Sequence, residues 1–165
     1  SKNTNFALLV SHKFDEPFDR PNDYAHAVSR LANQLSCGSV IVQKYGDVLL
    51  GRRTTEKRIQ DGFVKPTLKE AVPGDLGLCL PYNTMKSIIE MIEALDFVTP
   101  GIANEHTLLY GVEAKFYSAR PVCNDHFMTH IDGLYVGGDG AGITRGLAQA
   151  GANGVWVARD MIEKK

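Results

Sequence analysis

Half of the glycines in this chain lie in one short stretch near its C-terminus. The sequence holds 16 glycines in 165 residues, and eight of them fall between Gly133 and Gly154. Glycine has no Cβ, so it adopts positive φ angles and lets a neighbouring backbone or a ligand approach closely. From Gly133 to Ala158, only Asp139 and Arg145 carry a formal charge. The stretch therefore predicts a turn whose backbone a ligand or another segment can approach closely. Its composition differs from that of the rest of the chain.

The glycines follow a short apolar segment and precede a helical pattern. Leu134–Val136 indicates a buried strand, residues 137–142 a turn, and residues 143 to about 163 a closing helix. The first N–H groups of a helix favour an anion or an electron-rich oxygen, and Asp139 can accept hydrogen bonds from hydroxyl groups. The turn lacks the P-loop pattern, and Asp139 interrupts the G-x-G-x-x-G pattern of dinucleotide-binding turns. It is either a ligand-facing loop of another kind or simple turn chemistry with a helix cap.

Charge and composition exclude several classes of protein. Lys plus Arg is 18 and Asp plus Glu is 19, and this balance argues against a dedicated nucleic-acid binder. No apolar run reaches the roughly 18 residues of a membrane span, and residues 1–5 lack the apolar core of a signal peptide. Cys37, Cys79 and Cys123 form no C-x-x-C pair, which predicts reduced thiols and no zinc site. We therefore expect a cytoplasmic protein that holds no metal.

The remaining pattern predicts an α+β body with a mixed or antiparallel sheet and covering helices. Helical spacing begins near Pro21 and runs to Leu35, and the clearest helix spans residues 82–97. A boundary is expected within residues 111–121, near Pro121. Four segments have the length or alternation of strands: Phe6–Val10, Val40–Val42, Leu76–Leu80 and Val112–Tyr117.

The glycine-rich turn resembles a known flavin motif. Residues 137–142, followed by Thr144-Arg145-Gly146-Leu147, look like the C-terminal flavin motif of two-dinucleotide-domain flavoproteins. More narrowly, nearly the whole chain is similar to the family of uncharacterised FAD-dependent dehydrogenases, also described as NAD(FAD)-utilising dehydrogenases. The further segments that carry this resemblance are Asn5–Val10, Gly51–Thr55, Pro73–Leu76, Ile88–Asp96 and Glu105–Glu113.

The resemblance implies FAD as the cofactor of the full-length protein. Asp139 would bind the ribityl or pyrophosphate region, and the backbone at Gly140 would lie beside the pyrophosphate. The N–H groups of residues 144–147 would face N1 and O2 of the flavin, and Arg145 would either add to this or bind a surface carboxylate. The implied cofactor-binding set is Gly138, Asp139, Gly140, Thr144, Arg145, Gly146 and Leu147.

The G-x-G-x-x-G element that holds the ADP half of FAD in this family does not occur in the 165 residues. The resemblance therefore covers only the C-terminal part of such an enzyme. Residues 1–114 would be an inserted, substrate-facing domain of cap-like kind, and residues 115–165 the C-terminal segment of the FAD-binding domain. Expected partners are the Rossmann half of that domain, NAD(P)H and a small-molecule substrate, with neither nucleic acid nor membrane. The apolar C-terminal helix could also pair two copies.

The predicted function is thus a C-terminal fragment of an FAD-dependent oxidoreductase with an undetermined substrate, inactive and free of FAD by itself. The alternative is a non-catalytic phosphate- or nucleotide-binding module, or a structural assembly domain.

Three further groups of residues allow both a chemical and a structural interpretation. Glu105 and His106 are candidates for moving protons near a flavin, but neighbours on a strand point to opposite faces. His126 and His130 have the spacing of metal ligands but lack a third ligand, which favours two surface residues. The last group could bind a phosphate or form a solvated helix start; it comprises Arg52, Arg53, Lys57 and Arg58.

Overall fold

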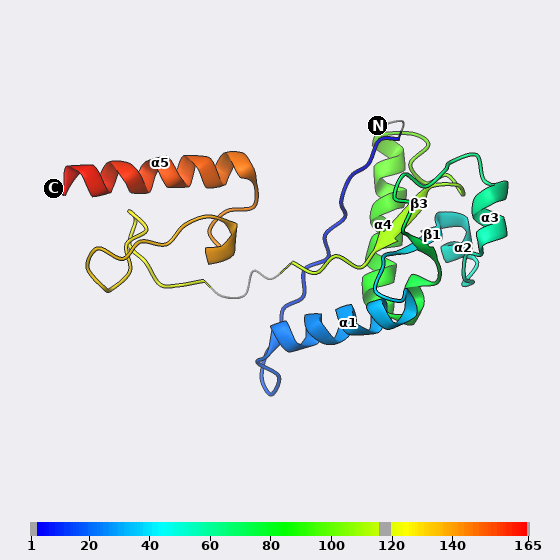
Figure 1. Cartoon of the computed structure of the whole chain (residues 1–165), viewed down its shortest axis with the longest axis horizontal. Coiled ribbons are helices and arrows are strands. Elements are labelled where there is room, and N and C mark those ends of the chain that lie inside the picture. Colours follow the sequence, from blue (N-terminus) through cyan, green and yellow to red (C-terminus); the bar gives the residue numbers. More distant parts are fainter. Residues whose placement is uncertain (1–2, 116–119, 165) are drawn as a thin grey trace. The chain divides into compact units, whose positions relative to one another are not determined.

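The computed structural model describes residues 3–115 and 120–164, which belong to two compact units, residues 1–114 and 115–165. Among these residues, eight named elements lie in unit 1 and two in unit 2. Figure 1 shows the ribbon of the chain, coloured from the N-terminus to the C-terminus. The elements of unit 1 are α1 (Pro21–Leu35), β1 (Ile41–Lys44), α2 (Tyr45–Leu49), α3 (Glu56–Asp61), β2 (Val72–Pro73), the 3-10 helix η1 (Leu76–Leu78), α4 (Tyr82–Val98) and β3 (Leu108–Gly111). Those of unit 2 are the 3-10 helix η2 (Asp139–Ala141) and α5 (Leu147–Glu163).

The sheet of unit 1 is small and mixed, with the strand order β2-β1-β3. β1 runs parallel to β2, with Ile41 beside Val72, and antiparallel to β3, with Val42 beside Tyr110. Because β1 is the middle strand, both of its edges are hydrogen-bonded, and its first three residues are buried. The predicted α+β class with a mixed sheet and covering helices is confirmed for this unit.

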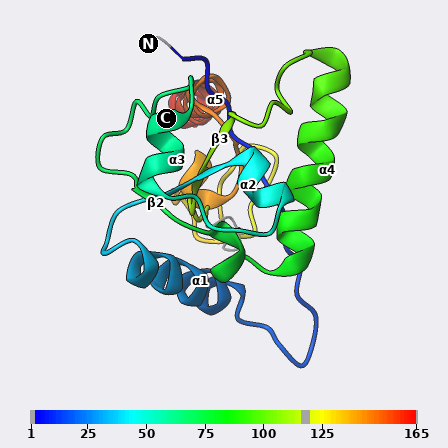
Figure 2. The ribbon, with the colours of Figure 1, turned by 90° about the vertical axis from the view of Figure 1, so that its right-hand side faces the viewer.

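The core of unit 1 lies where both long helices meet the sheet. It consists of five buried residues: Ala32, Ile41, Leu76, Cys79 and Met85. Figure 2 shows α4 running alongside the sheet and α1 crossing near one end of it. The helices predicted from residue 21 and over 82–97 are both confirmed, because their apolar spacing of three and four residues places one face of each helix on this core.

Three of the four strand predictions fail, each for a local reason. Residues 6–10 are extended but join no strand of the sheet, and they lie over α4 instead. Leu76–Leu78 forms η1, because the carboxylate of Asp75 accepts the N–H of Gly77 at 2.9 Å and starts a tight turn. Residues 112–115 have no regular structure, and residues 116 and 117 of that prediction lie outside the described residues. The strand expected at 40–42 is confirmed as β1.

In unit 2 the predicted strand over Leu134–Val136 is reduced to one isolated bridge between Met128 and Tyr135. The closing helix begins at Leu147 rather than at residue 143. Gly142 has a φ of 67°, in the left-handed region, so the chain leaves η2 in a direction that cannot continue as a right-handed helix.

We expect Ile41→Ala to lower the free energy of unfolding by about 2–5 kcal/mol, because Ile41 is a buried β1 residue and truncation leaves a cavity. Urea unfolding followed by far-ultraviolet circular dichroism measures this change. Leu49→Ala is the matched control, since Leu49 is 53% exposed and its truncation should change stability by only about 0.5 kcal/mol. Equal effects from the two substitutions would contradict the placement of the core.

Candidate functional site

The carboxylate of Asp139 holds the glycine-rich turn together. Its Oδ1 atom accepts a hydrogen bond from the hydroxyl of Thr144 and another from the N–H of Gly146, at 3.2 Å in the second case. The N–H of Ile143 donates to the carbonyl of Gly138 at 3.3 Å. Both side-chain bonds use one oxygen, so the carboxylate closes the loop, and its second oxygen accepts no hydrogen bond from residues 3–115 and 120–164.

Asn153, on α5, also belongs to this turn, although the sequence analysis did not identify it. Its Oδ1 atom accepts the N–H of Gly138 at 2.9 Å, and a Cβ at Gly137 would lie only 2.6 Å from the same oxygen. Any larger residue at 137 would therefore force the Asn153 side chain to shift. The side chain is buried, and its Nδ2 atom has no hydrogen-bond partner among the described residues. Buried polar groups are normally hydrogen-bonded, so this amide donor marks a place where an acceptor from outside the described residues could bind.

The outer side of the turn is open backbone. A Cβ built at Gly138, Gly140 or Gly146 would meet nothing within 4 Å. Gly146 immediately precedes the 17-residue helix α5, whose first residue, Leu147, is almost fully exposed. The first N–H groups of a helix have no partner within the helix, so an anion or a polar oxygen can approach them here.

Arg145 is drawn back onto the loop. Its guanidinium donates to the carbonyl of Thr144 at 3.1 Å and reaches that of Gly142 at 3.5 Å. Its backbone N–H donates to Oε1 of Gln149 at 3.0 Å. The structure thus gives Arg145 a role in stabilising the loop. The N–H groups of residues 145 and 146, which the resemblance directs at a flavin, both have acceptors within the protein.

The residues of the turn nevertheless fit the implied FAD. The open backbone at three glycines allows close approach, the helix start favours negative charge, and Asp139 can accept from hydroxyl groups. The unsatisfied amide of Asn153 adds a donor beside the same backbone.

Glu105 and His106 lie in a turn before β3, so the expectation that they alternate along a strand is wrong. The imidazole Nε2 is 3.6 Å from Oε1 of Glu105, and the ring packs on Phe63 with centroids 4.2 Å apart. The Nδ1 atom is buried and has no hydrogen-bond partner in the described part of the chain. The two side chains are therefore close enough to act together. They belong to unit 1, whereas Asp139 belongs to unit 2.

Two of the four basic residues at 52–58 contact a buried carboxylate that the sequence analysis missed. Asp47, on α2, is only 2% exposed. Its Oδ1 atom lies 2.6 Å from Nε of Arg52 and 3.7 Å from Nε of Arg58, and its Oδ2 atom accepts the hydroxyl of Thr54 at 2.7 Å. The two arginines are thus neither free in solvent nor fully neutralised.

These contacts decide the protonation of Asp47. Burial by itself would raise the pKa of the carboxyl group, but the hydrogen bonds from Thr54 and Arg52 and the charges of Arg52 and Arg58 outweigh it. The net effect is a pKa below the ordinary value for aspartate, so the group is ionised near neutral pH.

His126 and His130 do not form a pair on one helical face, because both lie in the irregular segment before η2. Instead, Nδ1 of His126 lies 3.0 Å from Oδ1 of the buried Asp160 on α5. The other oxygen of Asp160 accepts from Tyr135 at 2.5 Å and from Lys164 at 2.8 Å. The bonds from Lys164 and Tyr135 lower the pKa of Asp160. This cluster ties α5 to the segment before the glycine-rich turn.

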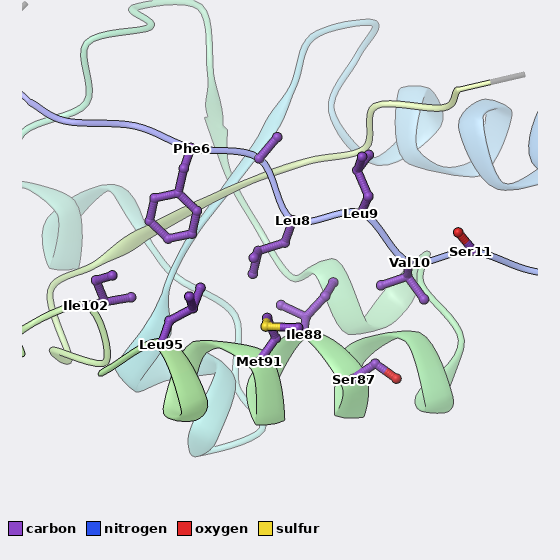
Figure 3. Close-up of a pocket in the computed structure, with 11 residues that line it drawn as sticks. Phe6, Leu8, Leu9, Val10, Ser11, Ser87, Ile88, Met91, Leu95 and Ile102 are labelled. Carbon is purple, nitrogen blue, oxygen red and sulfur yellow. The ribbon is translucent and has the colours of Figure 1, made fainter. Parts of the chain in front are cut away.

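A groove of about 630 Å³ lies between the extended N-terminal segment and α4. Figure 3 shows Phe6, Leu8 and Val10 directed at the helix, while Leu9 points away. The facing residues of α4 are mainly apolar and include Ile88, Met91 and Leu95. The groove is a hydrophobic contact between these two segments and contains no paired acid and base.

Among the described residues, no group of three or more His, Cys, Asp or Glu side chains could hold a metal ion. No helix in the same residues has both the length and the apolar content needed to cross a membrane.

A comparison with known proteins finds a distant relative of this chain. No family model matches the chain. A protein of Clostridium beijerinckii, described only as an uncharacterized protein, is 29% identical over 172 residues. The match covers 98% of this chain and 31% of the relative, so the chain spans about a third of the length of the curated relative that it matches.

The lowered pKa of Asp47 predicts a specific dependence of stability on pH. A carboxyl group whose pKa is lower in the folded protein stabilises the fold above its unfolded pKa of about 3.9, and this contribution disappears as the pH falls through the folded pKa. Asp47→Asn should therefore reduce stability most at about pH 5–7 and progressively less below about pH 4. Urea unfolding of both proteins across this range measures the difference. A difference that stays constant with pH would refute this role of the carboxylate.

Proposed function

We propose that this chain is the C-terminal part of an FAD-dependent oxidoreductase, a dehydrogenase of the family that its sequence resembles. In this proposal residues 1–114 form an inserted, substrate-facing domain, and residues 115–165 the C-terminal segment of the FAD-binding domain. FAD supplies the hydride chemistry when it is bound, and the protein positions it. The substrate is a small molecule, NAD(P)H is the second reactant, and the enzyme is cytoplasmic.

The observation that carries the proposal is the Asp139 turn at the start of α5. A 17-residue helix begins beside three glycines whose outer side is open, and one carboxylate accepts hydrogen bonds at the centre of the turn. The positive end of the helix dipole contributes about 0.3–1 kcal/mol to binding of negative charge, and about 2 kcal/mol at most. This arrangement suits the oxygen-rich middle of a dinucleotide and a flavin edge that becomes negative on reduction.

The chain's own residues then have distinct roles. Asp139 accepts from hydroxyl groups of the cofactor with the oxygen that Thr144 and Gly146 do not use. Gly138, Gly140 and Gly146 allow the approach of the cofactor to the backbone. Glu105 and His106 are the candidates for proton transfer, since their side chains lie 3.6 Å apart. Arg145 keeps the loop in shape through its contacts with carbonyl oxygens.

The proposal also needs a partner for the apolar side chains of α5. Leu147 is 95% exposed and Ile162 72%, and Val155 and Trp156 are each about half exposed. Because the relative is about three times as long as the matched region, we assign this cover to the Rossmann half of a longer polypeptide. Alternatively, a second copy of the chain packs on these side chains, and α5 then serves in assembly.

In the full-length protein, Asp139→Ala should remove FAD, because it deletes the carboxylate that accepts from the cofactor. The flavin absorbance of the purified protein, divided by its protein concentration, measures the loss. Thr144→Val is the structural control: it removes the hydroxyl that bonds Asp139 but leaves the carboxylate, so most of the flavin should remain. Asp132→Ala, an exposed acid of the same unit, should retain all of it. Normal flavin content in Asp139→Ala would rule out the assignment.

The 165-residue chain by itself should purify colourless. A helix N-terminus and one hydrogen bond of about 1 kcal/mol fall well short of the roughly 8 kcal/mol that micromolar affinity requires. Immobilising a long cofactor makes the balance still less favourable. Absorbance spectroscopy after gel filtration tests this, and stoichiometric flavin would show that this part of the chain binds FAD without the Rossmann half. A thermal-shift comparison of FAD, FMN, ATP and inorganic phosphate separates the alternative when it is repeated on Arg52→Lys, since a response to phosphate alone that persists in this variant indicates a binding module at the glycine-rich turn.

A further inference from the structure

The basic patch of unit 1, defined as Arg52, Arg53, Lys57 and Arg58, is anchored from inside the protein. Nε of Arg52 and Nε of Arg58 both face Oδ1 of Asp47, at 2.6 and 3.7 Å. The carboxylate is buried, whereas the two arginine side chains are 50% and 36% exposed. Each guanidinium therefore has one edge on the protein and another in solvent.

The backbone that carries the patch is fixed on both sides of Arg53. The N–H of Arg52 donates to the carbonyl of Asp47 at 3.0 Å, and the carbonyl of Arg52 accepts from Nε2 of Gln43 at 2.9 Å. The N–H of Thr54 donates to the carbonyl of Gly74, also at 2.9 Å. Holding the donors in place before a ligand arrives lowers the entropy lost on binding.

The patch keeps unused donors and surplus positive charge. A guanidinium has five N–H groups in a fixed fork, and the contacts with Asp47 involve Nε alone in each arginine. Nη1 of Arg58 donates to the carbonyl of Arg53 at 2.9 Å, which links α3 to the segment that precedes it. In residues 3–115 and 120–164, no carboxylate other than Asp47 forms an ion pair with any of the four cations. Within residues 47–58 the four positive charges lie beside two negative ones, the buried Asp47 and the exposed Glu56, so two positive charges remain in surplus.

We propose that the basic patch binds the phosphate group of a small ligand. The terminal N–H groups of Arg52 and Arg58 would donate to the phosphate oxygens, and Arg53 and Lys57 would add charge. Phosphate fits better than a carboxylate, because it carries up to two negative charges and presents several oxygens to more than one guanidinium. The phosphate can belong to a nicotinamide nucleotide or to a phosphorylated substrate. The site lies in unit 1 and does not depend on the flavin proposal for unit 2.

Isothermal titration calorimetry at low ionic strength tests the site directly on the 165-residue chain. The probes are inorganic pyrophosphate, NADP⁺ and NAD⁺. Binding of pyrophosphate that weakens as salt is added supports the proposal, because the contact is electrostatic. Tighter binding of NADP⁺ than of NAD⁺ assigns the phosphate to a nucleotide 2′-phosphate, and equal affinities point to the diphosphate. No heat from any probe at millimolar concentration overturns the proposal.

Two substitutions separate an organised site from a simple concentration of charge. Arg52→Lys keeps the charge but removes the fork, so affinity for pyrophosphate should fall about tenfold or more. Asp47→Asn makes the chain more positive by one charge but weakens the anchor of both arginines. An organised site predicts weaker binding for this variant, whereas charge alone predicts tighter binding.

Arg30→Gln removes an exposed charge on α1, outside the patch, and should leave the affinity nearly unchanged. Circular dichroism establishes that each variant is folded. If Asp47→Asn does not fold, the comparison of Arg52→Lys with Arg30→Gln decides the question. Wild-type affinity in Arg52→Lys, or tighter binding in a folded Asp47→Asn protein, overturns the proposal.

Discussion

The side chain of Gln43 joins three segments of unit 1 at the middle of the sheet. Its amide nitrogen donates to the carbonyl of Arg52 at 2.9 Å and reaches Oδ1 of Asp75 at 3.3 Å, and its oxygen accepts the N–H of Leu76 at 2.7 Å. The residue is 1% exposed, so an unmade bond would leave a polar group buried at a cost of about 1–3 kcal/mol. β1 therefore determines where the loop after α2 and the start of η1 can lie, although the strand itself has only four residues.

Both units use a carboxylate to order a segment that has little regular structure. Asp47 holds the loop that carries the basic patch, and Asp139 closes the glycine-rich turn. Asp160 binds three side chains and ties α5 to the segment before that turn. Short strands and 3-10 turns satisfy few backbone groups within themselves, so side-chain acceptors take over part of this role. The same acceptors bring positively charged or N–H-rich groups together, which is why the candidate binding features coincide with the ordered loops.

The sequence predicted best those elements whose pattern is long and periodic. The helices at 21–35 and 82–98 follow from apolar spacing over four or more turns. Leu76, Leu78 and Leu80 alternate as a strand would, but the cap from Asp75 and the flexibility of Gly77 decide the local structure. The run at 6–10 is apolar enough for a strand, and tertiary packing places it on α4. Asn153 and Asp160 were missed because polar residues on a helix normally face solvent. Their spacing of seven residues, two helical turns, was the available signal that they share a buried face.

The net charge of the chain is close to zero, but its charged residues are unevenly distributed. The formal charge of −1 argues against an extended nucleic-acid surface, yet residues 47–58 hold four cations beside the buried Asp47 and the exposed Glu56. What distinguishes this group from an ordinary solvated surface is the order of its backbone, which side chains and strands hold on either side of Arg53. The glycine-rich turn has almost no charged side chains. Its partial positive charge comes from the backbone N–H groups at the start of α5. The proposed dehydrogenase would have to recognise two phosphate-bearing molecules, a flavin and a nicotinamide nucleotide. In that proposal the glycine-rich turn of unit 2 would serve the first through backbone N–H groups, and the basic patch of unit 1 would serve the second through side chains, so substitutions in each can be tested separately.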